Sequence, residues 1–204
     1  AGDKAFGAGT DMSQFRAFET AEDAWDYEHR MDGVLNTLEA CPVPTIAAIN
    51  GACTGGGAGI AAACDLRIAT HTLKFGFPIA RTLGNCLSIA NLARLSELMG
   101  AARVREVIFT ARLVQAEEAL AIGLVSELVD DLDALHARAD ALAHQLAGHA
   151  PLTLRATKEG LRRLRAARAE VDDKDLVAMC YLSRDFKEGI EAFLNKRRPE
   201  WRGE

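Results

Sequence analysis

Three consecutive glycines, Gly55–Gly57, stand between a short apolar segment and a run of small residues, and they constrain the fold more than any other feature. Segment 45–50 predicts a buried strand, and segment 57–64, made almost wholly of Ala and Gly, predicts a helix that packs very closely against a neighbour. The glycines therefore place backbone N–H groups at a helix start, where unpaired donors and the helix dipole favour a developing negative charge. The pattern predicts an oxyanion-binding device; the alternative is a tight turn packed against a neighbouring segment.

The composition sets the broad class of the protein. The chain has 204 residues, of which 49% are apolar, so we expect a globular protein with a substantial core. A net charge of −5 disfavours a nucleic-acid surface, which needs an excess of Lys and Arg. Charge and Gly interrupt every apolar run short of a membrane span, and the chain does not begin like a signal peptide. We expect a cytoplasmic protein with neither nucleic acid nor membrane as a partner.

The cysteines and histidines do not follow the spacing of a metal site or a disulfide framework. The five cysteines are scattered, odd in number and contain no CxxC pair. The five histidines lack the HExxH spacing of a metal-binding helix. We therefore predict no metal, and we expect most of the thiols to be small buried side chains.

The apolar pattern predicts α/β alternation followed by helices only. We expect helices at 22–41, 87–99, 101–110 and 116–122, strands at 66–69, 73–76 and 124–129, and no strand within residues 1–11. Beyond residue 131 the pattern predicts helices at 132–147, 152–167 and 174–196. This divides the chain into a core, residues 1–131, and a helical region, residues 132–204.

The first expected helix carries its apolar residues at helical spacing. Its predicted buried face consists of residues at positions i, i+3, i+4 and i+7, namely Met31, Val34, Leu35 and Leu38.

Five segments, read together, resemble the crotonase family, which is the enoyl-CoA hydratase/isomerase superfamily. They are residues 4–11, 44–65, 75–78, 116–129 and 185–197, and they occur in the family's order over essentially the whole chain. The resemblance implies an α/β fold, a spiral of ββα turns followed by a helical region that assembles trimers or dimers of trimers. Because the similarity starts part-way into the family pattern, we expect the opening turns of the spiral to be missing from this sequence.

The resemblance also implies an activity and a set of binding residues. Family members bind acyl-CoA thioesters as substrates, without a further cofactor, and stabilise an enolate oxyanion with two backbone N–H groups. By position these donors are Thr10 and Gly56. Fixed donors of this kind are each worth about 10²- to 10³-fold in rate. Further substrate-binding positions are Ala8, Asp11, Gly55, Gly57, Gly59, Phe193 and Lys196, of which the last two match residues that meet the adenine and phosphates of CoA. The alternative for Lys196 is a solvated charge.

The sequence departs from the family's hydratases at both of their catalytic glutamates. The first position is Gly59, and the second is Ile79 or, with a one-residue shift, Ala80. The only acidic residue from position 40 through 96 is Asp65, which matches a structural aspartate. General acid–base catalysis needs a titratable group within reach of the proton, so ordinary hydration should be almost completely lost.

The loop 81–88 offers candidates for a replacement group. Cys86 is a nucleophile or base if nearby Arg81 lowers its pKa; the alternative is a buried inert thiol. Arg81 suits a second carboxylate on the acyl group, or a bicarbonate acting as the base; the alternative is a surface side chain. We expect Asn85 and Ser88 to cap the helix that follows.

Two main functions follow from these observations. The first is an acyl-CoA enzyme of lyase or isomerase type in fatty acid metabolism, for which isomerisation, decarboxylation, thioester hydrolysis and C–C cleavage can each use the same oxyanion hole. The second is a catalytically inactive acyl-CoA-binding or assembly subunit. A third, an unrelated phosphate-binding α/β protein, is disfavoured because the chain lacks GxxxxGK and the strand-GxGxxG-helix pattern.

Overall fold

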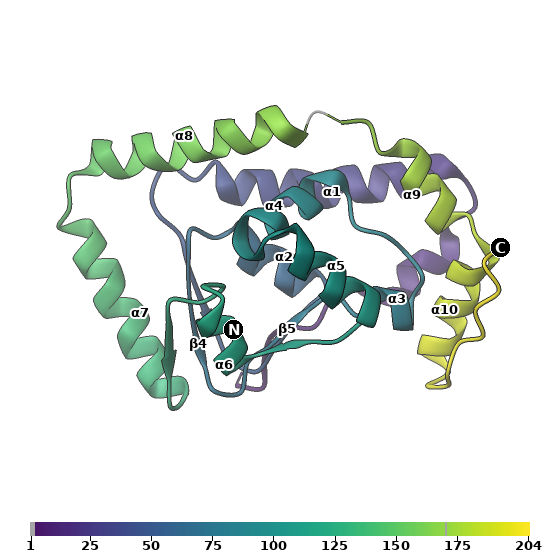
Figure 1. Cartoon of the computed structure of the whole chain (residues 1–204), viewed down its shortest axis with the longest axis horizontal. Coiled ribbons are helices and arrows are strands. Elements are labelled where there is room, and N and C mark those ends of the chain that lie inside the picture. Colours follow the sequence, from purple (N-terminus) through teal and green to yellow (C-terminus); the bar gives the residue numbers. More distant parts are fainter. Residues whose placement is uncertain (1–2, 170) are drawn as a thin grey trace.

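The computed structural model describes residues 3–169 and 171–204 (Figure 1). Its strands are β1 (Ala5–Gly7), β2 (Ile46–Ile49), β3 (Ala52–Thr54), β4 (Leu66–Thr70), β5 (Lys74–Gly76), β6 (Val114–Gln115) and β7 (Glu127–Val129). Its helices are the 3-10 helix η1 (Met12–Ala17), α1 (Ala21–Glu39), α2 (Gly56–Ala63), α3 (Ile79–Thr82), α4 (Ile89–Met99), α5 (Ala101–Thr110), α6 (Ala116–Ala121), α7 (Leu132–Ala147), α8 (Pro151–Ala169), α9 (Lys174–Tyr181) and α10 (Arg184–Leu194).

The strands form two small sheets, and successive strands from β1 to β5 alternate between them. One sheet has the order β2-β4-β7 and is wholly parallel; the other has the order β1-β3-β5-β6, in which only β5 and β6 are antiparallel. The pairs β2–β3 and β4–β5 each give one strand to each sheet before a helix follows, so the chain advances as a spiral. This is the mixed α/β spiral that the sequence predicted.

The main core lies between the two sheets and helices α2, α4 and α5. Its centre is formed by Ile49, Cys53, Phe75 and Leu124, which are all at most 1% exposed. Helix α2 enters this core on account of its composition: six of its eight residues are buried Gly or Ala. Small side chains let the helix backbone approach β1 and β3 closely, as the sequence predicted.

The C-terminal helices pack on residues 3–131 through two further clusters. Helix α7 covers the β2-β4-β7 sheet, where Leu135 and Leu142 contact Ile68. Helices α9 and α10 pack against α1 and η1, where Tyr181 and Phe186 join a cluster of aromatic rings. Figure 1 shows α8 along the outer edge of the molecule and α9 and α10 at one end. The boundary at residue 131 stays a prediction.

Several sequence predictions need correction. Residues 5–7 form β1, although no strand was expected there, because parallel pairing with β3 organises them. Strand β3 and the short helix α3 were also missed. The single helix expected at 174–196 is two helices, because the Ser183 hydroxyl accepts a hydrogen bond from the Phe186 amide and starts α10 anew.

The buried face of α1 is rotated relative to the prediction. Leu35 is buried, but Val34 is 53% exposed, and the buried side chains of this helix include Ala24 and Tyr27 instead. Other predictions are confirmed, because α5 and α7 have the predicted bounds and the Ser88 hydroxyl caps α4. Among the described residues, no helix combines the length and apolar character needed to cross a bilayer.

Candidate functional site

One cavity, of about 420 Å³, brings together residues that lie far apart in the sequence. The segment 8–12 and helices η1, α1, α2, α3, α9 and α10 each contribute to its wall. Most of the lining is apolar, with side chains such as Phe15, Met31, Leu83 and Leu87. This is the character of a small-molecule site, in which apolar walls surround a few polar groups.

Thr10 and Gly56 lie next to each other on the wall of this cavity. A Cβ built on Gly56 is 3.7 Å from Thr10 Oγ1, so the two residues are in van der Waals contact range. Gly56 is the first residue of α2, where the N–H has no partner within the helix. Within residues 3–169 and 171–204, neither main-chain amide donates a hydrogen bond. Both residues thus line the cavity, and their main-chain amides have no acceptor among the described residues.

The other two glycines of the triplet serve the packing of the turn. Gly55 has φ 55°, a left-handed conformation that favours glycine, and its N–H bonds to the Gly76 carbonyl at 3.1 Å. A Cβ on Gly57 would lie 2.4 Å from the Gly7 carbonyl oxygen, so only glycine allows α2 to sit this close to β1. The glycine triplet therefore forms a close-packed turn and also leaves the amide of Gly56 without a partner among the described residues. Gly55 lines the cavity and Gly57 does not.

Ala8 and Asp11, which flank Thr10 in the segment 8–11, also line the cavity. The Thr10 side chain is held by the hydroxyl of Tyr27 at 3.0 Å. The Asp11 carboxylate accepts hydrogen bonds from the amide and hydroxyl of Ser13, which lower its pKa. Asp11 is therefore an ionised cap of η1.

The positions that the resemblance assigns to the two hydratase glutamates, Gly59 and Ile79, line the cavity without a titratable group. Gly59 faces Leu35, whose Cδ1 lies 3.4 Å from a Cβ built on Gly59. Ile79 is buried in the cavity wall, whereas Ala80 is exposed and lines a separate cleft. Of the two positions considered for the second glutamate, Ile79 is therefore the one that lies in the cavity. Asp65 lies outside the cavity, where Thr45 and Lys158 bind its carboxylate.

One carboxyl group in the cavity was missed by the sequence analysis. Glu28, on α1, lines the cavity and accepts a hydrogen bond from the hydroxyl of Tyr181. Burial raises the pKa of Glu28 to about 7, and the hydrogen bond from Tyr181 partly opposes that rise. A signal existed: Glu28 precedes Met31 by three residues and Leu35 by seven, which is the spacing of one helix face.

The loop before α4 contributes two polar side chains to the cavity. Cys86 points its Sγ at the Leu176 carbonyl at 3.7 Å, and a hydrogen bond with Cys180, together with burial, raises the pKa of the Cys86 thiol. A neutral thiol favours the inert interpretation over the nucleophile. Asn85 does not cap α4; it donates to the Tyr181 hydroxyl at 3.1 Å, and its buried Oδ1 has no partner among the described residues.

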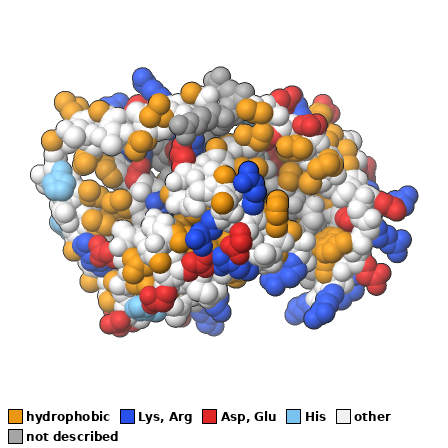
Figure 2. Space-filling model, viewed as in Figure 1, with side chains coloured by type: hydrophobic (Ala, Val, Ile, Leu, Met, Phe, Trp, Pro, Cys, Tyr) orange, Lys and Arg blue, Asp and Glu red, His pale blue; other side chains and the backbone are white. Residues whose placement is uncertain are grey.

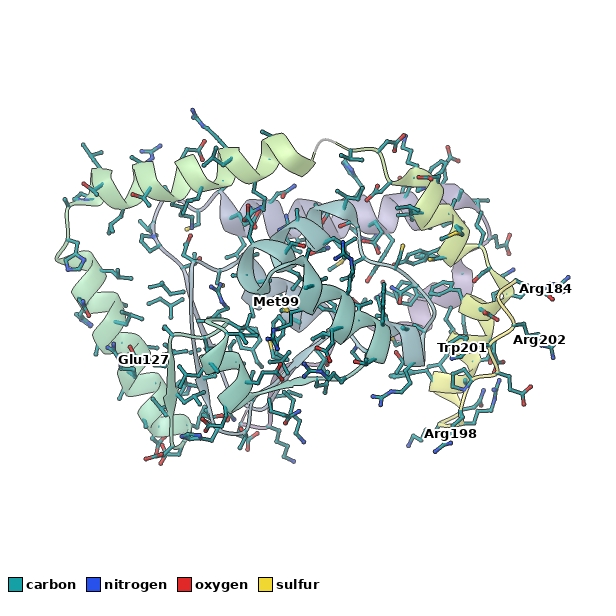
Figure 3. The ribbon with its side chains drawn as sticks, viewed as in Figure 1. Met99, Glu127, Arg184, Arg198, Trp201 and Arg202 are labelled. Atoms are coloured by element: carbon teal, nitrogen blue, oxygen red, sulfur yellow. The ribbon has the colours of Figure 1, made fainter. Side chains whose placement is uncertain are left out.

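A basic cleft adjoins the cavity and shares Thr82 and Phe193 with it. Arg81 lies in this cleft and not among the residues that line the cavity. The cleft also contains Arg198 and Trp201, which Figure 3 shows beside α10, and Figure 2 shows basic side chains gathered at that end of the molecule. Lys196 is exposed and belongs to neither lining.

Residues 1–204 match the protein family described as enoyl-CoA hydratase/isomerase. The chain belongs to this family. The chain is 33% identical over 210 residues to a short-chain-enoyl-CoA hydratase of Clostridium acetobutylicum, covering 98% of this chain and 77% of that protein. It is 36% identical over 208 residues to the human mitochondrial enoyl-CoA hydratase domain-containing protein 2, covering 97% of this chain and 69% of that protein.

Solved structures of the enoyl-CoA hydratase/isomerase fold agree with this membership. An enoyl-CoA hydratase/carnithine racemase from Magnetospirillum magneticum has a TM-score of 0.76 at 36% identity, covering 100% of this chain and 76% of that chain. A methylmalonyl-CoA decarboxylase in complex with 2-nitronate-propionyl-CoA has a TM-score of 0.87 at 29% identity, covering 97% and 76%. The predicted family and fold are thereby confirmed.

Proposed function

We propose that the protein is an enzyme that binds an acyl-CoA thioester and polarises its carbonyl between the amides of Thr10 and Gly56. The observation that supports this most directly is that two neighbouring residues of a mostly apolar cavity have main-chain amides without partners among the described residues. Proton removal beside a thioester, or attack on it, moves negative charge onto the carbonyl oxygen. Donors fixed in advance stabilise that charge without reorganisation. The similar methylmalonyl-CoA decarboxylase, solved with an acyl-CoA analogue, supports this class of ligand.

The basic cleft suits the nucleotide end of such a substrate. CoA carries phosphate groups and an adenine ring, and the cleft offers Arg81 and Arg198 beside the aromatic side chains of Phe193 and Trp201. A guanidinium binds phosphate with parallel hydrogen bonds, and aromatic rings stack on bases. We therefore assign Arg81 to the phosphates of CoA in preference to the acyl group. Lys196, exposed at the end of α10, is proposed as a second phosphate contact.

The reaction is proposed to differ from two-glutamate hydration. Gly59 and Ile79 stand at the wall positions where the family's hydratases carry their acid and base, and neither can transfer a proton. Reactions that place negative charge on the thioester oxygen and need fewer proton-transfer groups remain, namely isomerisation, decarboxylation, thioester hydrolysis and C–C cleavage. The missing glutamates also favour a second candidate function, an inactive subunit that binds acyl-CoA for assembly or regulation.

Incubation with a panel of acyl-CoA esters separates these functions. The purified chain is incubated with enoyl-, malonyl- and hydroxyacyl-CoA esters, binding is measured by calorimetry, and products are identified by mass spectrometry. We expect binding across the panel, conversion of at least one ester, and no hydration of crotonyl-CoA. Binding without any conversion supports the inactive subunit, hydration of crotonyl-CoA contradicts the proposed loss of that reaction, and no binding contradicts the proposed function.

A further inference from the structure

We propose that Glu28, oriented by Tyr181, is the group that moves protons in this site, at the carbon next to the thioester carbonyl. The proposal rests on the proposed function, because it takes the acyl-CoA site as given and adds the residue that acts on it. It assigns proton transfer to α1, whereas the resemblance places the two glutamates of the family's hydratases on α2 and α3.

The position of Glu28 is the first reason. Its side chain lines the same cavity as Thr10 and Gly56, so an acyl group whose carbonyl meets those amides lies in the space that Glu28 borders. The only other carboxylate lining the described cavity, Asp11, is engaged as the cap of η1. Glu28 is thus the carboxyl group of this cavity that does not cap a helix.

A hydrogen-bonded chain fixes the orientation of Glu28. Asn85 donates to the Tyr181 hydroxyl at 3.1 Å, and that hydroxyl donates to Oε1 of Glu28. Tyr181 is itself only 2% exposed and packs against Phe186, so it cannot turn away without disturbing the aromatic cluster. Oε2 of Glu28 makes no hydrogen bond with the part of the chain that the structure describes, which leaves it for a substrate proton.

The surroundings of Glu28 suit proton exchange near neutral pH. The charged groups that act on it are Asp32 of its own helix and Asp173 before α9, and both raise its pKa, as burial does. Tyr27 of the same helix, Tyr181 of α9 and the thiol of Cys86 are further titratable groups that interact with it, and the pKa of each is raised, so all three are neutral there. A carboxyl group with a pKa near the working pH takes up and returns protons most effectively.

The proposed step is balanced without any further reactant. The Glu28 carboxylate removes a proton from the α-carbon, and the C–H electron pair forms the enolate, whose oxygen the amides of Thr10 and Gly56 stabilise. The neutral carboxyl group then returns a proton to the same carbon, which exchanges its hydrogen, or to the γ-carbon of an unsaturated chain, which moves the double bond. One group thus acts as base and then as acid.

Hydrogen exchange on a saturated ester tests the proposal without requiring a productive turnover. Butanoyl-CoA is incubated with the protein in D₂O, and mass spectrometry follows the gain of deuterium at the α-carbon. We expect the exchange rate of the wild type to rise with pH through a midpoint near 7. Glu28→Gln, which keeps the shape of the side chain, should lower the rate by about 10²-fold or more. Glu22→Gln, an exposed glutamate of the same helix, is the matched control and should retain the wild-type rate.

Tyr181→Phe separates a positioning role from a merely structural one. The hydrogen bond from Tyr181 lowers the pKa of Glu28, so its loss should move the midpoint of the exchange profile to higher pH. An unchanged midpoint contradicts the positioning role. Circular dichroism checks that each variant is folded.

The outcomes distinguish this proposal from the one it rests on. Exchange that Gly56→Pro abolishes but Glu28→Gln leaves intact overturns the role of Glu28 and supports the oxyanion hole. Binding of butanoyl-CoA without exchange in the wild type at any pH also overturns the role of Glu28. Absence of binding overturns the proposed function itself.

Discussion

Glu28 is a carboxyl group that folding partly removes from water and places beside two other acids. Its pKa rises from 4.5 to about 7 in the folded protein, with burial as the largest cause. A raised pKa means that the folded state binds more protons than the unfolded state between these two values. The free energy of unfolding therefore falls as the pH rises through this window.

Glu28→Gln should remove this dependence. The contribution is fully present below about pH 4.5 and is lost by about pH 7, a difference of up to roughly 3 kcal/mol at about 1.4 kcal/mol per pKa unit. We expect the variant to match the wild type at pH 4.5 and to be more stable than the wild type at pH 8. Urea denaturation at both pH values measures this, with Glu22→Gln as the control. An equal difference between variant and wild type at the two pH values contradicts the raised pKa.

Gly56 and Gly57 are neighbours with opposite tolerance for a side chain. A Cβ on Gly57 would lie 2.4 Å from the Gly7 carbonyl oxygen, whereas one on Gly56 would have its nearest neighbour at 3.7 Å. We expect Gly57→Ala to cost about 1–3 kcal/mol, the usual effect of overpacking, and Gly56→Ala to cost less than about 1 kcal/mol. Denaturant unfolding of both variants measures the difference. Equal stabilities would contradict the close approach of α2 to β1.

At the scale of elements, α4 and α1 are joined by a buried polar network. The Arg94 guanidinium is 2% exposed and binds Glu39 at 2.9 Å and Asp32 at 3.2 Å. Arg165 of α8 binds the second oxygen of Glu39 at 2.6 Å, so three helices meet at one carboxylate. Such a network is sensitive to loss of one member, because the partner charges stay buried.

Arg94→Met should therefore destabilise the fold by about 3–5 kcal/mol, since it leaves Glu39 and Asp32 without their shared cation. Arg105→Met on the exposed side of α5 is the control, with an expected effect within about 0.5 kcal/mol. Thermal and chemical denaturation measure both. A small effect at position 94 would contradict the structural weight of this network.

Elements whose ends are marked by local chemistry could be predicted from the sequence. Gly100 ends α4, Ser88 starts it, and α7 begins after Asp131, whose carboxylate caps the helix. Strand β1 could not be predicted, because three residues become a strand only by pairing with β3, far along the chain. Glu28 was missed for a similar reason: an acid in a polar helix is ordinarily solvated, and its contact with Tyr181 depends on the packing of α9 against α1.

At the scale of the whole molecule, α8 exposes apolar side chains that the described part of the chain does not cover. They lie along its length, and their exposures are 77% for Leu152, 62% for Leu161 and 64% for Leu164. Leu161 and Leu164 lie one helical turn apart, and neighbouring exposed apolar side chains of this kind are typical of an interface. The trimer or dimer of trimers that the resemblance implies would bury them.

Leu161→Asp combined with Leu164→Asp should then convert the assembly to monomers. Size-exclusion chromatography with light scattering measures the mass of the wild type and of the variant. Leu152→Gln, a milder change at the other end of α8, should weaken the assembly less than the double variant does. A wild type that is monomeric at every concentration contradicts the expectation.

The cavity itself is a property of the whole molecule. Its polar groups come from the segment before η1, from α1, from the start of α2, from the loop before α4 and from α9, and only the packing of the folded chain brings these together. The sequence indicated the two amides because their motifs are local. It did not indicate Glu28, because long-range packing decides which side chains line the same cavity.

The stretching frequency of the thioester carbonyl tests the central claim most directly. Difference infrared spectra of bound butanoyl-CoA, labelled with ¹³C at the carbonyl, report how strongly the two amides polarise the C=O bond. We predict a lower frequency in the wild type than in water, a shift largely kept in Gly56→Ala, and a clear loss of shift in Gly56→Pro, which removes one N–H at a helix position that accepts proline. A bound carbonyl with the frequency of the free ester, or the same shift in all three proteins, would contradict the oxyanion hole at Thr10 and Gly56.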